Sequence, residues 1–170
     1  IIYHKYFLNE VFQTGNYLVL LTNHSYQTMK NICHNYHIYY DYLICNHDTL
    51  IIDNKEHIID KHLINNYSVL NIIHLFNQSD FTSKILCYNA LGYVTRNYQE
   101  VAMIKLRTNK EIDLLTAYPF INTLLPDIEI KTGGYFHTII SKFDNKLSIE
   151  SIINNINEDV ETYVLSDSYE

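Results

Sequence analysis

The sequence predicts an α/β fold in which a parallel-sheet core carries an inserted α+β segment. Continuous apolar runs at 17–21 and 40–45 flank a helical pattern, as in strands buried on both faces of a sheet. The middle of the chain alternates between apolar and polar residues, which is typical of an open sheet covered by helices on one side. The last segment again combines a helical pattern with a short apolar strand, as the first segment does. We therefore expect residues 1–57 and 136–170 to form the core and residues 58–135 the insertion.

The first 57 residues predict two helices, two strands and a hairpin. After an initial helical pattern, the strand "YLVLL" leads into a helix that starts near Ser25 and has Asn23 or Ser25 as its cap. The run "YDYLIC" forms the second strand, and a short hairpin turns around Asp53 and Asn54. A strand, a helix and a strand with short links predict a right-handed parallel crossover.

The middle segment has a different pattern. A helix is expected over "NNYSVLNIIHLFNQ", followed by a polar stretch from Ser79 to Tyr98 and a strand over "EVAMIKLRT". The next stretch begins as a helix and is bent or broken at Pro119. The pair Gly133 and Gly134 then joins two strands in the strongest hairpin signal of the chain.

The last segment predicts an amphipathic helix and one more buried strand. The stretch "NKLSIESIINNINED" places Ile149, Ile152, Ile153 and Ile156 on one helical stripe. The strand "TYVL" follows, and Asp167 comes directly after its carboxyl end. Ligands bind at this edge of open parallel sheets, so a functional group is expected here.

The composition excludes several classes of protein. The chain has 170 residues, of which 47% are hydrophobic and 18% charged, so it is long enough for a folded core. A net charge of −7 argues against binding to nucleic acid or to anionic membrane lipid. There is no apolar run of roughly 20 residues and no signal-peptide pattern. Three cysteines without CxxC spacing fit a reducing compartment, so we expect a cytoplasmic protein.

Polar groups that suit a phosphorylated ligand follow the predicted strands. Thr22 and Asn23 can donate hydrogen bonds to phosphate oxygens, and the helix that starts after them favours an anion at its N-terminus. Lys146 begins a helix and can offset phosphate charge. Asp167 offers a carboxylate of the kind that magnesium prefers. Because Thr22-Asn23 and Asp167 each follow a predicted buried strand, they can converge on one crevice. There these groups could neutralise and position phosphate for transfer.

The ordered set of segments resembles the haloacid dehalogenase-like hydrolases, in particular the Cof-type sugar-phosphate phosphatases. "LVLLTN" resembles the motif that supplies Thr22, and "DYLICNHDTLIID" resembles the loop that supplies Asn46. "FHTIISKFDNKLSIESII" is similar to the segment with the lysine, here Lys146, and "VLSDSYE" is similar to the motif of Asp167. The resemblance covers essentially the whole chain.

This resemblance implies a Rossmann-like core with an inserted α+β cap domain. It also implies a magnesium-dependent phosphatase that acts on a small phosphorylated metabolite. Thr22 and Lys146 would then be catalytic, Asn23 and Asn46 would bind the substrate, and Asp167 would bind the Mg²⁺ ion. No nucleic acid or membrane partner is implied.

Several positions depart from the family pattern. Ser166 replaces a glycine, His47 and Asp48 replace the usual Asn-Gly pair, and Glu170 stands where the family has asparagine. The family's nucleophile motif, Asp-x-Asp-Gly-Thr, would precede Tyr3 and is not in the printed sequence. Its first aspartate forms the phospho-enzyme in that family. We therefore expect a fragment of a larger enzyme or, alternatively, an inactive relative that only binds phosphate or another protein.

Other interpretations remain open for the same residues. The stretch "NHDTL" also resembles a decayed nucleophile motif, with Asn46 in place of the nucleophile. Thr22 could simply cap a helix, Lys146 could be a solvated surface charge, and Asp167 could be a turn residue. A structural zinc module is a third hypothesis, although the cysteines and histidines of "CHNYH" and "CNH" lack regular zinc spacing.

Overall fold

Short apolar runs separated by polar caps and turns produce an alternating order of helices and strands. The computed structural model describes residues 5–142 and 145–156. Within these residues the elements are α1 (Lys5–Gln13), β1 (Val19–Leu21), α2 (Tyr26–Tyr36), β2 (Tyr42–Cys45), β3 (Leu50–Asp53), β4 (Ile58–Lys61), α3 (Asn66–Asn77), β5 (Thr82–Asn89), β6 (Val101–Thr108), α4 (Leu114–Ala117), α5 (Ile121–Leu124), β7 (Ile128–Gly133), β8 (Phe136–Ser141) and α6 (Asn145–Ile156).

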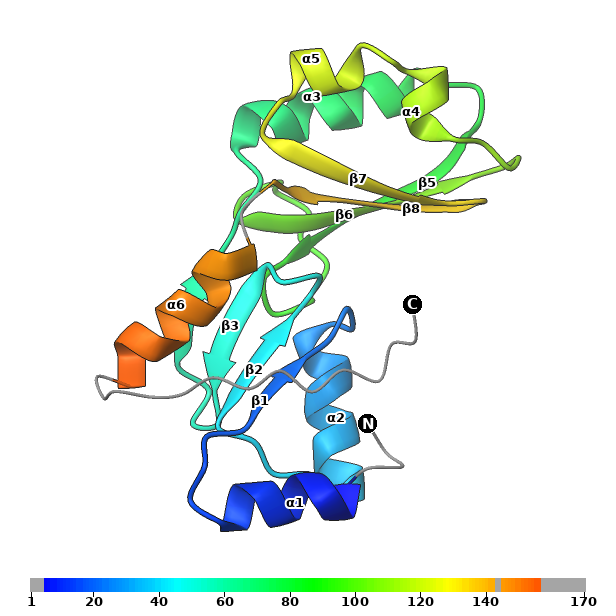
Figure 1. Cartoon of the computed structure of the whole chain (residues 1–170). Helices are drawn as coiled ribbons and strands as arrows, with labels where there is room; N and C mark the ends of the chain where they lie inside the picture. The colour runs from blue at the N-terminus through cyan, green and yellow to red at the C-terminus, as the bar shows by residue number, and fades with distance from the viewer. Residues whose placement is uncertain (1–4, 143–144, 157–170) are drawn as a thin grey trace.

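The elements form two units, each built on its own four-stranded sheet (Figure 1). The first unit contains α1, α2, α6 and the sheet β1-β2-β3-β4, and the second contains α3, α4, α5 and the sheet β5-β6-β8-β7. The first sheet is mixed: β1 and β2 are parallel, and β3 and β4 pair antiparallel. The predicted strand–helix–strand unit and the hairpin after it are confirmed.

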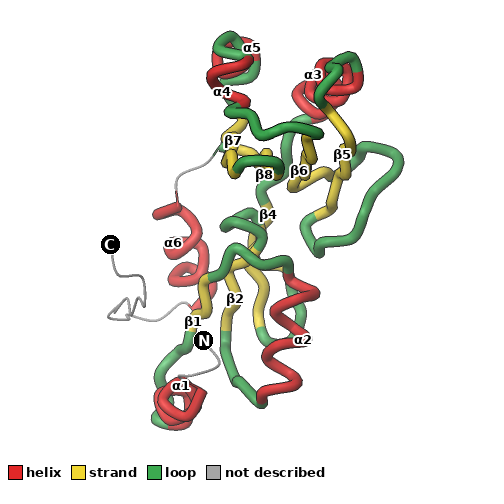
Figure 2. Tube along the Cα trace, turned by 90° about the vertical axis from the view of Figure 1, so that its right-hand side faces the viewer, coloured by secondary structure: helices red, strands yellow, loops and turns green. Residues whose placement is uncertain are grey.

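The first sheet has helices on both faces, because the side chains of β2 alternate between two apolar clusters. Leu43 and Cys45 pack with residues of α2, whereas Tyr42 and Ile44 pack with Ile152 of α6. Figure 2 shows the strands of this sheet between α2 and α6. These three layers make the Rossmann-like core that the sequence predicts.

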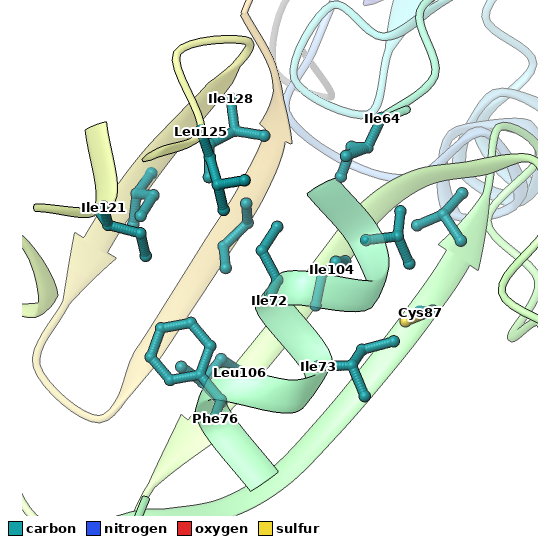
Figure 3. Close-up of a cluster of buried hydrophobic side chains, with 14 of the residues drawn as sticks. Ile64, Ile72, Ile73, Phe76, Cys87, Ile104, Leu106, Ile121, Leu125 and Ile128 are labelled. Carbon is teal, nitrogen blue, oxygen red and sulfur yellow. The ribbon is translucent and has the colours of Figure 1, made fainter. Parts of the chain in front are cut away.

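The second sheet is antiparallel, and its helices all lie on one face (Figures 1 and 2). Apolar side chains of α3 and of the α4–α5 segment meet alternate residues of the strands in one buried cluster, part of which is drawn in Figure 3. The predicted placement of helices on one face of this sheet and the hairpin at Gly133–Gly134 are confirmed. The predicted break in the helical segment is also present, between Ala117 and Ile121 around Pro119.

The strand pairing places the boundaries between the two units at residues other than those expected from the sequence. β4 pairs with β3 in the first sheet, although residue 58 was expected to begin the insertion. β8 lies between β6 and β7 in the second sheet, although residue 136 was expected to return to the core. The reason is that β7 and β8 form one hairpin, so a boundary at residue 135 divides a paired unit. The expected polar stretch from Ser79 to Tyr98 also contains a strand, β5.

No helix in the part of the chain that the structure describes has the length and apolar character needed to cross a membrane.

Candidate active site

The predicted residues Thr22, Asn23 and Asn46 lie at one edge of the first sheet. β1 and β2 run parallel, with Leu21 opposite Ile44, so both strands end at the same edge. The backbone N–H of Thr22 donates to the carbonyl of Ile44 at 2.9 Å. One step further, the N–H of Asn46 donates to the carbonyl of His24 at 2.8 Å. These bonds hold the segment after β1 against the turn after β2.

Thr22 does not cap the following helix, because Ser25 has that role. The Ser25 hydroxyl accepts a hydrogen bond from the N–H of Thr28 at 3.3 Å, at the N-terminus of α2. The Thr22 hydroxyl accepts one from the N–H of His24 at 3.2 Å, and its own hydrogen can still be donated. Thr22 is half-buried and Asn23 is exposed. Both residues therefore lie beside a helix N-terminus that favours an anion.

Asn46 is fully buried and starts a tight left-handed turn. Its φ is 56°, and those of His47 and Asp48 are 56° and 67°. Asparagine, aspartate and histidine tolerate this conformation better than most residues. The side-chain amide of Asn46 donates to the carbonyl of Ala90 in the second unit, and among the described residues its amide oxygen has no hydrogen-bond partner. The Asn46 side chain therefore links the two units.

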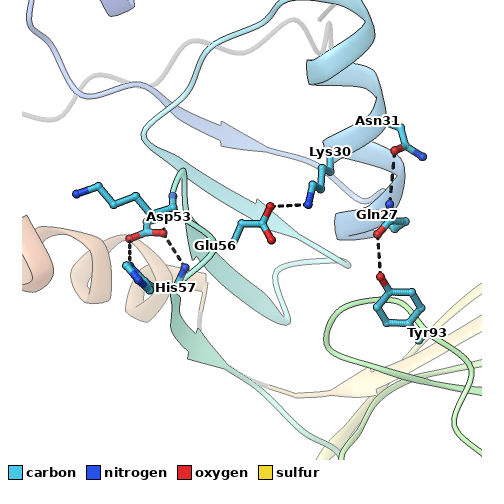
Figure 4. A network of polar contacts seen from close by, with 8 residues as sticks. Gln27, Lys30, Asn31, Asp53, Glu56, His57 and Tyr93 are labelled. Atoms are coloured by element: carbon cyan, nitrogen blue, oxygen red, sulfur yellow. Dashed lines mark hydrogen bonds and ion pairs between the residues drawn. The ribbon is translucent and has the colours of Figure 1, made fainter.

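The segment after β5 makes further contacts with the start of α2. The Tyr93 hydroxyl donates to Oε1 of Gln27 at 3.1 Å (Figure 4). Gly92 has a φ of 88°, and a Cβ atom there would lie 2.9 Å from the Cβ of Ser25. A side chain at this position would therefore be strained and would collide with the helix cap.

Charged groups of the second unit act on the turn after β2. Partial burial, together with the positive charges of Lys131 and Lys105 and the nearby His24, lowers the pKa of His47. Burial raises the pKa of Asp48, and Glu129 adds to this effect while Lys131 opposes it. Lysines of the second sheet thus lie within electrostatic range of the predicted site. These residues were not predicted from the sequence, although the exposed Lys105 and Arg107 in the alternating run "EVAMIKLRT" were the available signal.

The structure places Lys146 only in part. It is the second residue of α6, which begins at the end of the first sheet that faces the second unit (Figures 1 and 2). Its side chain, and all of Asp167, Ser166 and Glu170, lie outside the described residues. The meeting of Thr22 and Asp167 therefore stays a prediction.

The described residues do not form a magnesium site by themselves. Among residues 5–142 and 145–156, no group of three or more His, Cys, Asp or Glu residues could hold a metal ion. Burial raises the pKa of the Cys33 thiol to about 11 and, with Asp48, that of the Cys45 thiol to about 12. Both thiols are therefore protonated at neutral pH, which disfavours metal binding.

Two further features bear on the alternatives. The "NHDTL" segment forms the turn of an antiparallel hairpin, β2–β3, and does not lead from a parallel strand into a helix. A cavity of about 540 Å³ lies between α3, β5 and residues 94–98 of the second unit. It contacts none of the predicted site residues, so we assign the site from the strand ends and not from the cavity.

Comparison with known proteins identifies the family. A profile of the haloacid dehalogenase-like hydrolases matches residues 3–170, and the chain therefore belongs to this family. No curated protein sequence is matched. The resemblance that the sequence motifs indicate is confirmed.

Solved structures of the same family share the fold. BT1666 from Bacteroides thetaiotaomicron, a phosphatase of the haloalkanoate (HAD) superfamily, superposes with a TM-score of 0.69 at 14% identity, over 90% of this chain and 64% of that one. BT4131, described as a subclass IIB sugar phosphatase, has a TM-score of 0.63 at 13% identity, over 89% and 67% of the two chains. TM0651 from Thermotoga maritima has a TM-score of 0.68 at 12% identity, over 87% and 66%. The chain thus spans about two thirds of the length of these relatives.

Proposed function

We propose that this chain belongs to a cytoplasmic, magnesium-dependent phosphatase of the Cof type that hydrolyses a phosphomonoester of a small metabolite. The observation that carries the proposal is the hydrogen bond from Asn46 N–H to the carbonyl of His24. It holds the two predicted loops together at the carboxyl edge of the parallel strands, where ligands bind in this fold class. Membership of the family and the sugar-phosphatase relative support a phosphorylated small molecule as substrate.

Each predicted residue has a role in this proposal. The Thr22 hydroxyl donates a hydrogen bond to a phosphate oxygen, and the nearby N-terminus of α2 attracts the same anion. Asn23 and Asn46 orient the substrate beside it. Lys146 neutralises phosphate charge from the start of α6. Asp167 is the proposed ligand of magnesium, which would neutralise further negative charge on the phosphate when bound.

The second unit would act as the cap that determines substrate choice. Its segment after β5 contacts the turn after β2 through Asn46 and Ala90 and contacts the start of α2 through Gln27 and Tyr93. A cap in this place would exclude water around the bound phosphate and would present its own side chains to the rest of the substrate.

A second candidate function is phosphate binding without turnover. The observation that favours it is that the motif around Asp167 departs from the family pattern, with Ser166 in place of glycine and Glu170 in place of asparagine. In that case Thr22, Lys146 and the N-terminus of α2 would hold a phosphorylated ligand, and no phospho-enzyme would form.

Hydrolysis of p-nitrophenyl phosphate by the full-length protein that contains this chain distinguishes the two. A phosphatase releases p-nitrophenol with magnesium, loses this activity with EDTA and loses it in Asp167→Ala. The matched variant Asp80→Ala removes an exposed carboxylate elsewhere and should keep full activity. No turnover with magnesium, together with retained binding of inorganic phosphate, would establish the second candidate. Full activity of Asp167→Ala would contradict the metal assignment.

A further inference from the structure

The face of the second sheet that lies opposite its helices carries a group of cations. Strand register defines this face, because directly paired residues point to the same side of a sheet. Ile85, Ile104 and Ile139, one position away along their strands, pack into the cluster beneath α3. The opposite face therefore presents the cations Lys84, Lys105, Arg107 and Lys131. It is directed toward the first unit (Figures 1 and 2).

The central row of this face is the most regular part of the group. Lys105 of β6 and Lys131 of β7 are each directly opposite Thr138 of β8. Neighbouring strands are about 4.8 Å apart, so the backbones of the two lysines are roughly 10 Å apart with a hydroxyl between them. This separation lets two flexible lysine side chains reach one phosphate or carboxylate from opposite sides while Thr138 donates from the middle.

The rows on either side define the limits of this surface. Met103 and Ile140, on the row nearer to the end of β8, are buried. On the other side, Arg107 lies over the ring of Phe136 at 5.6 Å, and Phe136 is 64% exposed. The Lys105–Thr138–Lys131 row is thus the first on this face beyond the buried residues.

Acidic groups on the same face do not cancel the cations. Glu129 is on the row next to Lys131, and their closest charged atoms are 3.9 Å apart, at the outer limit of an ion pair. Lys105 lies over the ring of Tyr88 at 5.8 Å. Asp48 of the first unit lies within electrostatic range of this face, because Lys131 lowers its pKa and Glu129 raises it. In a chain with a net charge of −7, four cations and one carboxylate on these strand positions form a local positive surface.

This surface is close to the proposed active site. Lys105 and Lys131 both act electrostatically on His47, which follows Asn46 in the turn after β2. His24, in the segment that contains Thr22, acts on the same imidazole. A molecule bound with its phosphate beside Thr22 would therefore extend past His47 toward the lysines.

We propose that Lys105, Lys131 and Thr138 bind a second anionic group, a phosphate or carboxylate, at the far end of the substrate. This inference rests on the proposed function, because it assumes that the scissile phosphate lies beside Thr22. It narrows the substrate class to phosphorylated metabolites with two acidic groups. Each charge-assisted contact strengthens binding of such a molecule relative to an analogue that lacks the second group.

Equilibrium binding of fructose 1,6-bisphosphate and fructose 6-phosphate to the full-length protein tests this inference. By calorimetry at low salt, the bisphosphate should bind about tenfold more tightly. Lys105→Gln/Lys131→Gln should remove this preference, and Lys131→Arg should keep most of it. Lys55→Gln, which removes an exposed charge from the β3–β4 turn, should leave the preference unchanged and serves as the matched control.

The possible outcomes separate this inference from the proposed function. Equal affinities for the two sugars, no binding of the bisphosphate, or a preference that survives in the double lysine variant would each overturn the distal anion site. Loss of the preference in the double variant supports it whether or not the protein turns over phosphate esters. Because both lysines are at least partly exposed, their replacement should leave the thermal transition unchanged, which checks that the variants fold.

Discussion

The side-chain amide of Asn46 donates a hydrogen bond to the backbone carbonyl of Ala90, and this contact joins the two units. Asn46 directly follows β2 of the first sheet, and Ala90 directly follows the edge strand β5 of the second. The donor is completely buried. Together with the hydrogen bond from Tyr93 to Gln27, this contact links the end of the parallel strands to the second unit.

Replacement of Asn46 by alanine should destabilise the protein. The change leaves the buried carbonyl of Ala90 without this donor and places alanine at a φ of 56°, so we expect a loss of about 1–3 kcal/mol in the free energy of unfolding. Urea denaturation measures this loss. Asn23→Ala removes an exposed asparagine from the neighbouring segment and should change stability by less than about 0.5 kcal/mol. Equal stability of the two variants would show that the contact does not join the units.

His47 should titrate below its ordinary pKa of 6.5, chiefly because of burial and also because Lys131 and Lys105 oppose its protonation. The unfolded chain then binds this proton more readily than the folded one. Stability contributed by neutral His47 is therefore present above pH 6.5 and is lost as the pH falls below that value. NMR titration of the imidazole in the wild type and in Lys131→Gln measures the effect.

Removal of the Lys131 charge should raise the pKa of His47 toward the ordinary value. Lys55→Gln, at the far end of the first sheet, should leave it unchanged. If neither variant moves the pKa of His47, the second sheet does not approach the turn after β2 as described.

The structure also shows which parts of the fold were predictable from local sequence. The apolar runs in β1 and β2, the capping residue Ser25 and the hairpin glycines at 133–134 all carry short-range signals, and each element was predicted. The expectation that β1 is buried on both faces is wrong for the described residues, because Val19 and Leu21 are exposed and only Leu20 is buried. β5 was missed because an edge strand exposes polar residues such as Lys84 and loses the apolar pattern.

Long-range pairing could not be read from the sequence. The strand β8 was assigned to the core because its composition fits either sheet, and only its pairing with β6 and β7 decides the matter. The Asn46–Ala90 contact could not be predicted for the same reason. The two residues are 44 positions apart in the chain, and the residues around each give no indication that they meet. For the candidate active site, Thr22 was predicted from its position after a strand and Asn46 from the family resemblance, whereas the lysines of the second sheet were not predicted.

The carboxylate of Asp53 should stabilise the β3–β4 hairpin. It accepts hydrogen bonds from the N–H groups of Lys55 and His57, each at 2.8 Å, and from the His57 ring at 2.9 Å (Figure 4). Although partial burial acts in the opposite direction, these bonds lower the pKa of Asp53 below 3.8. This stabilisation is present above pH 3.8 and is lost as the pH falls through the lowered pKa.

Asp53→Ala should therefore lower the free energy of unfolding by about 1–2 kcal/mol at neutral pH. The difference from the wild type should shrink in strongly acidic solution. Asp80→Ala, at an exposed position, should have little effect at either pH. A constant difference across the acidic range would exclude an ionised Asp53 as the source of the stability.

Thr22 should contribute to turnover through its hydroxyl group. In the full-length protein, Thr22→Val keeps the shape of the side chain but removes a donor to the phosphate, and kcat should fall about 100-fold. Thr22→Ser keeps the hydroxyl and should retain most of the activity. Steady-state kinetics with p-nitrophenyl phosphate measures both variants. A Val variant as active as the Ser variant would exclude the hydroxyl from catalysis.

The most direct test of the central claim is the position of the metal site relative to the strand ends. Mn²⁺ can replace Mg²⁺, and its unpaired electrons broaden the NMR signals of nearby amides in the full-length protein. We predict that Mn²⁺ broadens the signals of Thr22, Asn46 and Asp167 together, spares the turn at residues 54–57, and loses this effect in Asp167→Ala. Broadening around Asp167 without any effect on Thr22 and Asn46 would show that these groups do not share a site.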